Sequence, residues 1–524
     1  MTLWTIGSLL VSATEYLRQK GSSNPRLDAE LLLAHALGLE RIDLYTQYDR
    51  PVSDAERDGF RALVARRAKH EPVAYILGRA HFRRLILDVS PAVLIPRPET
   101  EELVDLALET LRLRPLWEGL GEGPLVADVG TGSGAIALSL ASEAGVKVLA
   151  TEASAKALAV AARNRARLKL EALVELRQTD LLEGVPDGSI RLVVSNPPYI
   201  SREEYPGLPP DVRLYEPRVA LDGGQDGLEV IRRLVSHAAR VLGPGGSLLM
   251  EVGHSQAEAV AELASTAGFA LVSIRKDLAG KDRFVAATLP GAPVLSLDAL
   301  SEADRRALAE ALATGAIVTL PTDTVYGLAA YWSSRAGVRR LFAAKGRGEE
   351  RPVAVLFPSV EAVHSSLPDV EPVALRIMEA LLPGPYTFVV KTAVPRPSLV
   401  GMPDSLGVRV PDHPALLNLL DTLGMPVAAT SANLSGGPDP GSLSEVEPKL
   451  LAHCAAALRD DGPSERDRAK RDGAGRADRT GRAGRGLAST VVDLRPLGAG
   501  GRPVVLREGV VPAEEVLERI AGLL

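Results

Sequence analysis

Asp128-Val-Gly-Thr-Gly-Ser-Gly-Ala-Ile-Ala-Leu138 is the stretch of sequence that decides the fold. The apolar run 125–128 leads into the glycines, and a helical pattern follows them, which predicts a strand, a tight turn and a helix. Glycines let a ligand approach the backbone, and the first turn of a helix has free N–H groups. The sequence therefore predicts a ligand site at this turn.

Short apolar runs alternate with helical patterns downstream of the glycine turn. Further strands are expected at 147–152, 190–194 and 247–251. Strands separated by helices at this spacing predict a parallel, doubly wound α/β sheet with helices on both faces. The run Gly243-Pro-Gly-Gly246 is expected to break the chain just before the last of these strands.

The regions around this sheet predict two further domains. The 524 residues correspond to about three domains at roughly 150 residues each. Residues 1–78 show apolar side chains at helical spacing and predict a helical bundle, with Gly38 ending one helix and a capping box at 53–56 opening another. We assign the doubly wound sheet to residues 79–290. A second α/β pattern then predicts a third domain at 291–524.

Composition excludes several classes of protein. Hydrophobic residues make up 46% and charged residues 24%, as in soluble globular proteins, and a net charge of −6 argues against wholesale wrapping of nucleic acid. No run of about 18 apolar residues predicts a membrane helix, and the N-terminus does not resemble an export signal. The single cysteine, Cys454, permits no internal disulfide. We expect a cytoplasmic protein.

A charged, glycine-rich stretch at 463–486 interrupts the third domain. It holds eight Lys or Arg residues and four acidic ones, so it cannot bury a core and is expected to be a flexible basic insertion. Two interpretations stay open for it. It is either a solvated loop or a segment that contacts RNA phosphates.

The glycine turn alone does not identify the cofactor. Gly130-x-Gly132-x-x-Ala135 also satisfies the relaxed dinucleotide fingerprint of dehydrogenases. Glu152 ends the next strand, twenty residues past Gly132, and is expected to bind ribose hydroxyls with either cofactor. A nucleoside-containing cofactor is therefore expected, and its nature stays open at this point.

The turn Asn196-Pro197-Pro198-Tyr199, after the third strand, separates these alternatives. A bound planar NH₂ group needs two acceptors, which the Asn196 side-chain oxygen and the carbonyl before Pro198 supply. The prolines stiffen the turn, and Tyr199 is placed to press the planar group against a methyl donor. An ordinary proline turn is the alternative explanation. The pattern favours methyl transfer from S-adenosylmethionine to an amide or amino nitrogen over hydride transfer.

Together with other segments, this turn resembles the HemK/PrmC family over about residues 5–290. The segments that carry the resemblance are Glu71–Gly78, Val93–Glu101, Glu251-x-Gly253-x-x-Gln256 and Asp277–Arg283. The resemblance implies methylation of the glutamine side-chain amide in the Gly-Gly-Gln motif of peptide chain release factors. It also implies that the helical domain docks this protein substrate.

The same resemblance assigns roles to individual residues. It implies that the cofactor is bound by the residues of the glycine turn, by the strand end and by the adenine contacts: Gly130, Thr131, Gly132, Ser133, Gly134, Glu152, Asp180, Leu181 and Asn196. Many members of the family have Asp in place of Glu152. Asn196, Pro197, Pro198 and Tyr199 are implied to form the catalytic clamp on the glutamine amide, with Asn196 and Tyr199 binding the substrate. Arg97 and Glu99 form either a structural ion pair or a substrate contact.

A second group of segments follows residue 320. They are Leu320–Leu328, Ala344–Arg347, Leu382–Thr387, Gly407–Pro411, Thr430–Gly436, Ser489–Val492 and Leu506–Gly509. Lys345, Arg347 and Arg507 suit a triphosphate, whose charge must be neutralised as pyrophosphate leaves. Taken singly, each segment also has an ordinary explanation as a helix end or a turn.

Together these segments resemble the YrdC/TsaC family of L-threonylcarbamoyl-adenylate synthases, over about residues 295–520. The resemblance implies an α/β domain with a twisted sheet that converts L-threonine, bicarbonate and ATP into threonylcarbamoyl-AMP for tRNA modification. Magnesium is expected with the phosphates, and the sequence indicates no metal site of the protein itself. The product is expected to pass to the tRNA threonylcarbamoyl transferase machinery.

The family pattern also assigns ligands in this domain. It implies threonine binding by Thr324, Arg409 and Ser489, and ATP binding by Lys345, Arg347, Ser405, Ser431, Asn433 and Arg507, with Lys345 and Arg347 catalytic. Two features depart from the pattern. Leu382 stands where an aromatic residue is common, and the insertion at 463–486 lengthens a stretch that is usually short.

We therefore predict a fused, bifunctional enzyme that serves translation. One alternative is a methyltransferase acting on nucleic-acid amino groups, against which the acidic residues following Tyr199 argue. The other is a C-terminal half that binds double-stranded RNA, as relatives do, without catalysis. The presence of both Lys345 and Arg347 argues against that alternative.

Overall fold

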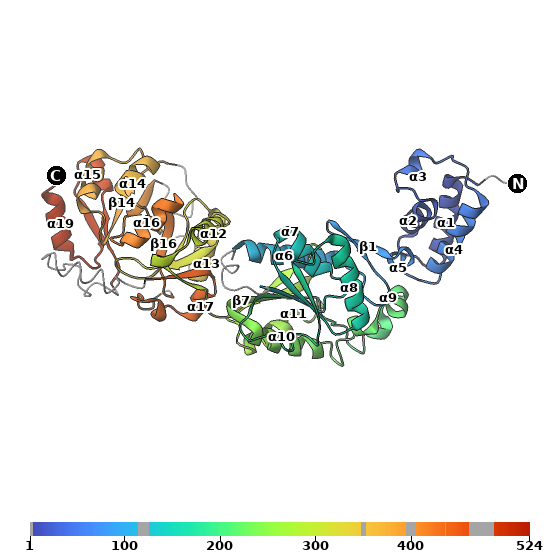
Figure 1. Cartoon of the computed structure of the whole chain (residues 1–524). Coiled ribbons are helices and arrows are strands. Elements are labelled where there is room, and N and C mark those ends of the chain that lie inside the picture. The colour runs from blue at the N-terminus through green and yellow to red at the C-terminus, as the bar shows by residue number, and fades with distance from the viewer. Residues whose placement is uncertain (1–3, 114–124, 347–352, 395–403, 435, 461–486) are drawn as a thin grey trace.

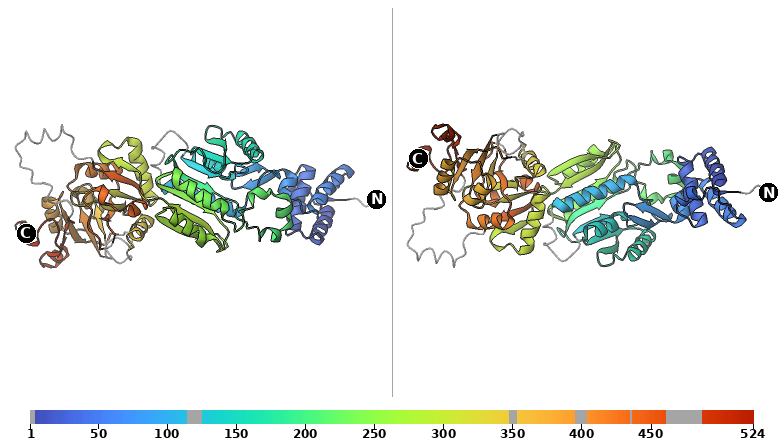
Figure 2. Two further views of the ribbon diagram at one scale, coloured as in Figure 1. Left: turned by 90° about the horizontal axis from the view of Figure 1, so that it is seen from below. Right: turned by 90° about the horizontal axis from the view of Figure 1, so that it is seen from above.

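The computed structural model describes residues 4–113, 125–346, 353–394, 404–434, 436–460 and 487–524. These residues form three bodies in a row, with a small helical bundle at the N-terminal end and the largest sheet at the C-terminal end (Figures 1 and 2). None of the helices within these ranges combines the length and the apolar surface that crossing a membrane requires.

The N-terminal bundle buries one apolar face of each main helix in a shared core. Its helices are α1 (Ile6–Gln19), α2 (Pro25–Leu37), α3 (Asp43–Thr46), α4 (Asp54–Arg67) and α5 (Val73–Leu77). The predicted signals at the helix ends are confirmed. Ser53 and Glu56 form a reciprocal capping box at the start of α4, and Gly38 ends α2 with a φ of 64°, which suits glycine.

A short hairpin and a long helix connect this bundle to the central sheet. The hairpin pairs β1 (Arg79–Phe82) with β2 (Leu85–Asp88), and the helix is α6 (Pro98–Leu113). Leu103, Val104 and Ala107 of α6 are fully buried in the core on one face of the sheet.

The central sheet has seven described strands in the order β5-β4-β3-β6-β7-β9-β8. They are β3 (Val126–Val129), β4 (Val148–Glu152), β5 (Val174–Gln178), β6 (Ile190–Ser195), β7 (Leu242–Glu251), β8 (Leu271–Lys276) and β9 (Asp282–Thr288). Strands β3 to β7 pair in parallel, as predicted, but β9 pairs antiparallel with both β7 and β8. The sheet is therefore mixed, because a short connection returns β8 to β9 at one edge.

Helices cover both faces of this sheet, which confirms the predicted doubly wound class. They are α6, α7 (Ala135–Ala144) and α8 (Ala155–Leu168), together with α10 (Glu229–Val241) and α11 (Ala257–Thr266). The buried residues of α6 and α7 share one core with β3, whereas those of α10 and α11 share the core on the other face. Between β6 and α10 lie two short 3₁₀ turns, η2 (Tyr205–Gly207) and η3 (Arg218–Ala220), and α9 (Pro210–Tyr215).

The prediction that residues 243–246 break the chain before β7 is wrong. These residues lie inside β7, which starts at Leu242. Ile190 pairs with Leu242 and Leu192 with Ser247, so the glycine-rich run forms a bulge between two paired segments. The residues of this run do not pair with β6, but the strand continues beyond them, because a β-bulge accommodates unpaired residues with unusual backbone angles.

The C-terminal body is built on ten described strands in the order β10-β17-β11-β12-β16-β13-β15-β14-β18-β19. They are β10 (Val294–Ser296), β11 (Ile317–Leu320), β12 (Gly327–Tyr331), β13 (Ala354–Leu356), β14 (Tyr386–Lys391), β15 (Ser405–Arg409), β16 (Val427–Ser431), β17 (Cys454–Arg459), β18 (Thr490–Asp493) and β19 (Val504–Arg507). The helices are α12 (Glu302–Ala313), α13 (Arg335–Ala344), α14 (Val360–Ser366), α15 (Pro372–Leu381), α16 (Pro414–Leu423), α17 (Pro448–Leu451) and α19 (Ala513–Ala521), and the 3₁₀ turns are η4 (Leu297–Ala299), η5 (Leu443–Glu445) and η7 (Arg495–Ala499). The capping box predicted at Ser301 and Asp304 is present at the start of α12.

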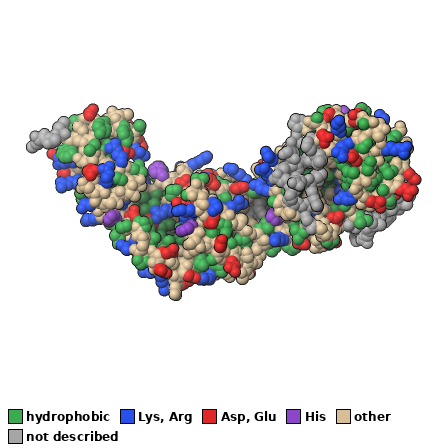
Figure 3. Space-filling view, turned by 180° about the vertical axis from the view of Figure 1, so that it is seen from behind, with side chains coloured by type: hydrophobic (Ala, Val, Ile, Leu, Met, Phe, Trp, Pro, Cys, Tyr) green, Lys and Arg blue, Asp and Glu red, His purple; other side chains and the backbone are tan. Residues whose placement is uncertain are grey.

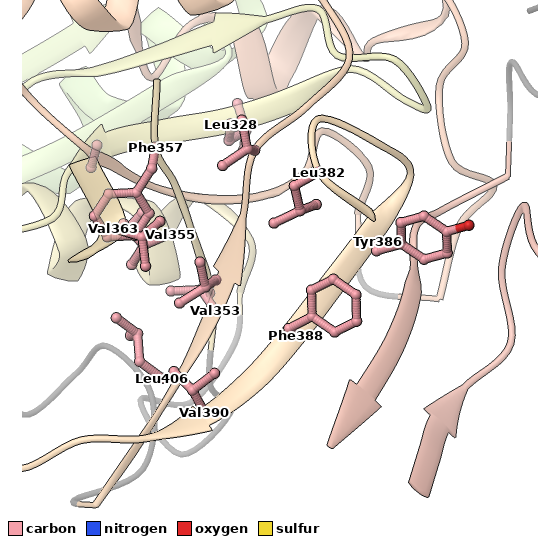
Figure 4. Packing of buried hydrophobic residues seen from close by; sticks show 14 of the residues in the cluster. Leu328, Val353, Val355, Phe357, Val363, Leu382, Tyr386, Phe388, Val390 and Leu406 are labelled. Atoms are coloured by element: carbon pink, nitrogen blue, oxygen red, sulfur yellow. The ribbon is translucent and has the colours of Figure 1, made fainter. Parts of the chain in front are cut away.

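Alternation along β15 separates the core of this body from a polar face. Leu406 and Val408 are fully buried and pack with Phe388 and Val390 of β14 in a large apolar cluster, part of which is shown in Figure 4. Because successive side chains of a strand point to opposite faces, Ser405 and Arg409 lie on the other face. Leu382, where the sequence departs from the family pattern, packs in the apolar cluster.

The central and C-terminal bodies touch through α6. Glu109 on α6 and Arg340 on α13 form an ion pair of 3.1 Å, and the Thr314 hydroxyl donates to the Arg112 carbonyl at 3.2 Å. Leu113 packs against Ala311 of α12 in a small apolar cluster. Acidic and basic side chains are interspersed over the face of the central body drawn in Figure 3.

Candidate active sites

The turn after β3 has the backbone geometry that its glycines predict. The φ angles are 74° at Gly130, 58° at Gly132 and 87° at Gly134, a region that L side chains rarely adopt. A Cβ at Gly134 would also lie 2.8 Å from the Leu138 Cδ1 atom. The turn therefore needs these glycines to lead directly into α7.

Asp128 ties the end of β3 to the start of α7. Its Oδ2 accepts hydrogen bonds from the Thr131 hydroxyl at 2.6 Å and from the Ala137 N–H at 3.0 Å. Complete burial raises the pKa of Asp128 to about 7, because the charged carboxylate is deprived of water. The buried Asp128 carboxyl thus fixes the glycine turn through these two hydrogen bonds.

Glu152 lies beside this turn at the end of β4, the neighbouring strand. Its Oε2 accepts from the Gly132 N–H at 3.0 Å, and its Oε1 accepts from the Ser154 N–H at 2.9 Å. Two backbone donors therefore fix both oxygens of the carboxylate at the strand end.

A cavity of about 320 Å³ lies over these strand ends. Most of the predicted methyltransferase residues line it: Gly130, Thr131, Gly132, Ser133, Glu152, Asp180, Leu181, Asn196 and Pro198. Gly134, Pro197 and Tyr199 are not among its lining residues. Sequence reasoning missed Arg233, which lines the cavity and pairs with Asp180 at 2.6 Å.

The Asn196 amide is held by a chain of buried side chains. Asn196 Nδ2 donates to the Thr100 hydroxyl at 2.9 Å, and that hydroxyl donates to Glu251 Oε2 at 2.7 Å. Burial raises the pKa of Glu251 above its ordinary value. Thr100 and Glu251 fall within segments that carry the family resemblance, but nothing in the sequence indicates their contact, because they lie far from Asn196 along the chain.

The Tyr199 end of the turn is held by its backbone. Gln256 Nε2 donates to the Tyr199 carbonyl at 2.9 Å, and Gln256 Oε1 accepts from the Gly253 N–H at 3.2 Å. A Cβ at Gly227 would lie 2.4 Å from Gln256 Nε2, so the close approach requires a glycine there. Burial raises the pKa of the Tyr199 hydroxyl to about 12, so it stays protonated near neutral pH and is not a base.

Of the two alternatives for Arg97 and Glu99, the structural ion pair between them is not formed, because Arg97 pairs with another carboxylate. Arg97 Nη2 donates to both carboxylate oxygens of Glu216, at 2.7 and 2.8 Å. Glu216 is nearly fully buried, so it offers the guanidinium a fixed carboxylate, whereas Glu99 lies in the first turn of α6. Arg97 also lines the cavity beside Asn196, so its proposed substrate contact stays open.

In the C-terminal body, one cluster surrounds Lys345. The ammonium, at the C-terminal end of α13, donates to the Ser431 carbonyl at 2.5 Å and to Asn433 Oδ1 at 2.6 Å. The Asn433 amide donates in turn to Asp439 at 3.0 Å. Three of the residues predicted to bind ATP, namely Lys345, Ser431 and Asn433, are therefore in direct contact.

A second cluster surrounds Arg409 on the polar face of β15. Arg409 Nη2 donates to the Thr324 hydroxyl at 2.7 Å and to Asp323 Oδ1 at 2.5 Å. Asp323, which sequence reasoning did not single out, neutralises the guanidinium. Both residues predicted to bind threonine from this part of the chain thus lie together, with a carboxylate beside them.

Strand register relates the remaining predicted residues. Ala354 of β13 lies level with Gly407 and with Ala429, so Ser405 and Ser431 sit at one level and on one face, two strands apart. Ser489 hydrogen-bonds the Thr387 hydroxyl at 2.8 Å, and its carbonyl accepts from Arg507 at 3.0 Å.

A further cavity of about 440 Å³ lies at the carboxyl ends of β11 and β17. Thr322 and Tyr326, which line it, fall in the singled-out segment Leu320–Leu328, but no lining residue of this cavity, Asp460 included, was assigned a ligand. Arg347 and the insertion 463–486 lie outside the described residues. Within the described ranges, no group of three or more His, Cys, Asp or Glu side chains is placed to hold a metal ion.

The central site combines a glycine turn, a strand-end carboxylate fixed by two backbone donors and an Asn-Pro-Pro-Tyr turn, an arrangement typical of an amino- or amide-directed methyltransferase. Family models agree with this class. Residues 8–78 match the PrmC N-terminal domain, and residues 108–206 match the methyltransferase small domain. Residues 310–471 match the Sua5, YciO and YrdC model, which is described as telomere recombination.

Among curated proteins, the chain is similar to release factor glutamine methyltransferases. That of Rhodopirellula baltica is 43% identical over 289 residues, which is 54% of this chain and 96% of the relative. That of Geobacter sulfurreducens is 43% identical over 283 residues, again 54% of this chain and 96% of the relative. A solved structure, P. abyssi Sua5 complexed with L-threonine, aligns with a TM-score of 0.36 and 28% identity over 45% of this chain and 61% of that one.

The chain belongs to the release factor glutamine methyltransferase family over its N-terminal half. Its C-terminal half carries a Sua5/YrdC-type domain. The chain therefore joins a release factor glutamine methyltransferase half to a domain that matches the Sua5, YciO and YrdC model.

Proposed function

We propose that the N-terminal half, residues 1–290, methylates the side-chain amide of the glutamine in the Gly-Gly-Gln motif of peptide chain release factors. The observation that carries this proposal is the orientation of Asn196 at the cavity. Its Nδ2 is engaged by Thr100, so its Oδ1 is left to accept from a substrate NH₂ group. The carbonyl of Pro197 is the second acceptor in this proposal.

The residues of the cavity fit S-adenosylmethionine. Gly130 and Gly132 line the cavity with backbone that carries no side chain, and the fixed carboxylate of Glu152 suits the two hydroxyls of a ribose. Asp180 and Leu181 line the cavity on the side that we assign to the adenine. When bound, this cofactor supplies an electrophilic methyl group.

Catalysis by this site rests on orientation. An amide nitrogen is a weak nucleophile, and the protonated Tyr199 hydroxyl offers no base. Asn196 and the rigid prolines instead hold the substrate nitrogen in line with the methyl carbon. Such positioning lowers the activation barrier, because translational and rotational entropy is already lost on binding.

Release factors are proposed to dock on the N-terminal bundle, which contacts the loop that follows the Asn-Pro-Pro-Tyr turn. The Tyr215 hydroxyl of α9 donates to the Lys69 carbonyl at 2.8 Å. Arg67 of α4 lies 4.0 Å from Asp211. A protein bound to the bundle would therefore have a fixed position relative to the cavity.

The test combines the full chain with labelled S-adenosylmethionine and a release factor. A matched factor, with the motif glutamine replaced by alanine, serves as the control. We expect label on the first factor and none on the second. Equal labelling of both, or labelling of an adenine-containing DNA instead, would refute the proposal.

The C-terminal half, residues 291–524, is proposed to form threonylcarbamoyl-AMP from L-threonine, bicarbonate and ATP. The cluster of Lys345, Ser431 and Asn433 supports this proposal, because a buried ammonium with oriented polar partners suits a phosphate group. In this proposal Ser405, Arg347 and Arg507 complete the ATP site, and Thr324, Arg409 and Ser489 bind threonine. Magnesium would accompany the triphosphate.

The chemistry needs a carbamate oxygen to attack the α-phosphate while pyrophosphate leaves. Cations placed on the leaving phosphates stabilise the charge that develops there. Pyrophosphate release that requires threonine, bicarbonate and ATP together is the expected result with the full chain. Release that is independent of threonine, or absent with all three present, would favour a non-catalytic module that binds double-stranded RNA.

The remaining partners belong to the same proposal. The adenylate would pass to the tRNA threonylcarbamoyl transferase machinery, and both substrates belong to translation, which favours the cytoplasm. An RNA contact through 463–486 stays a prediction, since those residues lie outside the described ranges.

A further inference from the structure

Two buried side chains lie behind Asn196, and neither belongs to the Asn-Pro-Pro-Tyr turn. Thr100 is in the first turn of α6 and is 4% exposed, and Glu251 ends β7 and is 2% exposed. The Thr100 hydroxyl lies between the other two groups, 2.9 Å from Asn196 Nδ2 and 2.7 Å from Glu251 Oε2. Three separate elements thus meet at one hydroxyl.

The hydrogen count of this chain fixes its direction. A threonine hydroxyl has one hydrogen, and in the structure Thr100 donates it to Glu251 Oε2. Thr100 can then only accept from Asn196, which turns the NH₂ end of the amide inward. Asn196 lines the cavity, and its Oδ1 has no hydrogen-bond partner within the described ranges.

This direction matters for a substrate that presents an NH₂ group. The reversed amide would place two N–H donors against the donors of the substrate, and the site would then repel the group that it must bind. Burial raises the pKa of Glu251, whereas the hydrogen bond from Thr100 and the charge of Arg283 on β9 favour its carboxylate form. The Tyr199 hydroxyl is placed to donate to Oε1 at 3.5 Å, which leaves Oε2 to accept from Thr100.

We propose that Thr100 and Glu251 are positioning residues, whose hydrogen-bond chain turns the Asn196 amide so that its oxygen faces the substrate nitrogen. This inference rests on the proposed methyl transfer to a glutamine amide. It assigns a role to the segments Val93–Glu101 and Glu251–Gln256, which meet behind the turn.

The main experiment compares Thr100→Val with Thr100→Ser in the full chain. Valine keeps the shape and loses the hydroxyl, so we expect kcat for methyl transfer to fall about 30- to 100-fold. This is less than the loss of about 100- to 1,000-fold when a preorganised group itself is removed, because Thr100 acts through Asn196. The KM for the release factor and the Kd for S-adenosylmethionine should change less than threefold. Serine restores the hydroxyl and should stay within fivefold of the wild-type kcat.

A double-mutant cycle tests whether Thr100 acts through Asn196. If it does, Thr100→Val combined with Asn196→Ala should have the kcat of Asn196→Ala alone, within about threefold. Losses that multiply would show that Thr100 acts independently and would overturn the inference. So would a wild-type kcat in Thr100→Val, or an equal loss in Thr100→Ser.

Glu251→Gln provides a second test of direction, since glutamine keeps the size but can donate a hydrogen to Thr100. We expect a kcat loss comparable with that of Thr100→Val, and wild-type activity would contradict the inference. Failure of the proposed function looks different, because the wild-type chain itself would then transfer no label to the release factor.

Discussion

Replacing Glu152 by glutamine tests the proposed cofactor site most directly. The carboxylate accepts from the Gly132 N–H at 3.0 Å and from the Ser154 N–H at 2.9 Å, which leaves its remaining lone pairs for ribose hydroxyls. Glutamine has one acceptor oxygen, so its NH₂ group must face one of these backbone donors or the ribose.

The expected magnitude follows from the loss of one charge-assisted hydrogen bond, about 1.5–3 kcal/mol. Since 1.4 kcal/mol is a factor of ten, the Kd for S-adenosylmethionine should rise about 10- to 150-fold. At saturating cofactor, kcat should change less than threefold, because the ribose is held equally in the ground state and the transition state. Glu152→Asp keeps the charge and should weaken binding less.

Isothermal titration with S-adenosylmethionine and initial rates at varied cofactor give the two constants. Glu175→Gln is the matched control, because Glu175 lies on β5, pairs with Arg177 at the surface and does not line the cavity. A Kd for Glu152→Gln within threefold of wild type would refute the ribose role. So would a fall in kcat with an unchanged Kd.

Three further predictions concern other parts of the molecule. Asn196→Ala should lower kcat for methyl transfer about 100- to 1,000-fold, the loss expected when one preorganised polar group is removed. Its Kd for S-adenosylmethionine should stay within threefold of the wild-type value, and loss of cofactor binding would contradict the clamp role. Lys345→Ala should abolish pyrophosphate release yet leave threonine binding by calorimetry intact, and retained release would exclude Lys345 from the ATP site. Burial raises the pKa of Asp128 from 3.8 to about 7, so between these pH values the folded state binds a proton that the unfolded state has lost. The free energy of unfolding therefore falls as pH rises towards 7, by up to about 4 kcal/mol from this group. The thermal midpoint of the Asp128→Asn chain should therefore fall less than that of wild type between pH 5 and pH 8, and equal falls would contradict this reasoning.

The sequence predicted most of the local structure because the signals are short-range. The capping boxes at Ser53 and Ser301, the left-handed end of α2 at Gly38 and the glycine turn after β3 each depend on residues a few positions apart. The doubly wound class followed from the alternation of strands and helices. The break predicted at 243–246 was wrong, because β6 pairs with β7 on both sides of the glycine run, at Leu242 and at Ser247, and the run itself forms a bulge.

By itself the sequence predicted two kinds of site, since the glycine turn, Asn196–Tyr199 and the Lys345 segment are contiguous motifs whose residue types indicate their chemistry. Only the tertiary structure decided which side chains support them. Thr100 and Glu251 reach Asn196, Glu216 displaces Glu99 as the partner of Arg97, and Asp323 neutralises Arg409. The physical reason is that a hydrogen bond or ion pair depends on atoms meeting within about 3 Å. Packing of elements far apart in the chain sets these distances, and no local pattern records them.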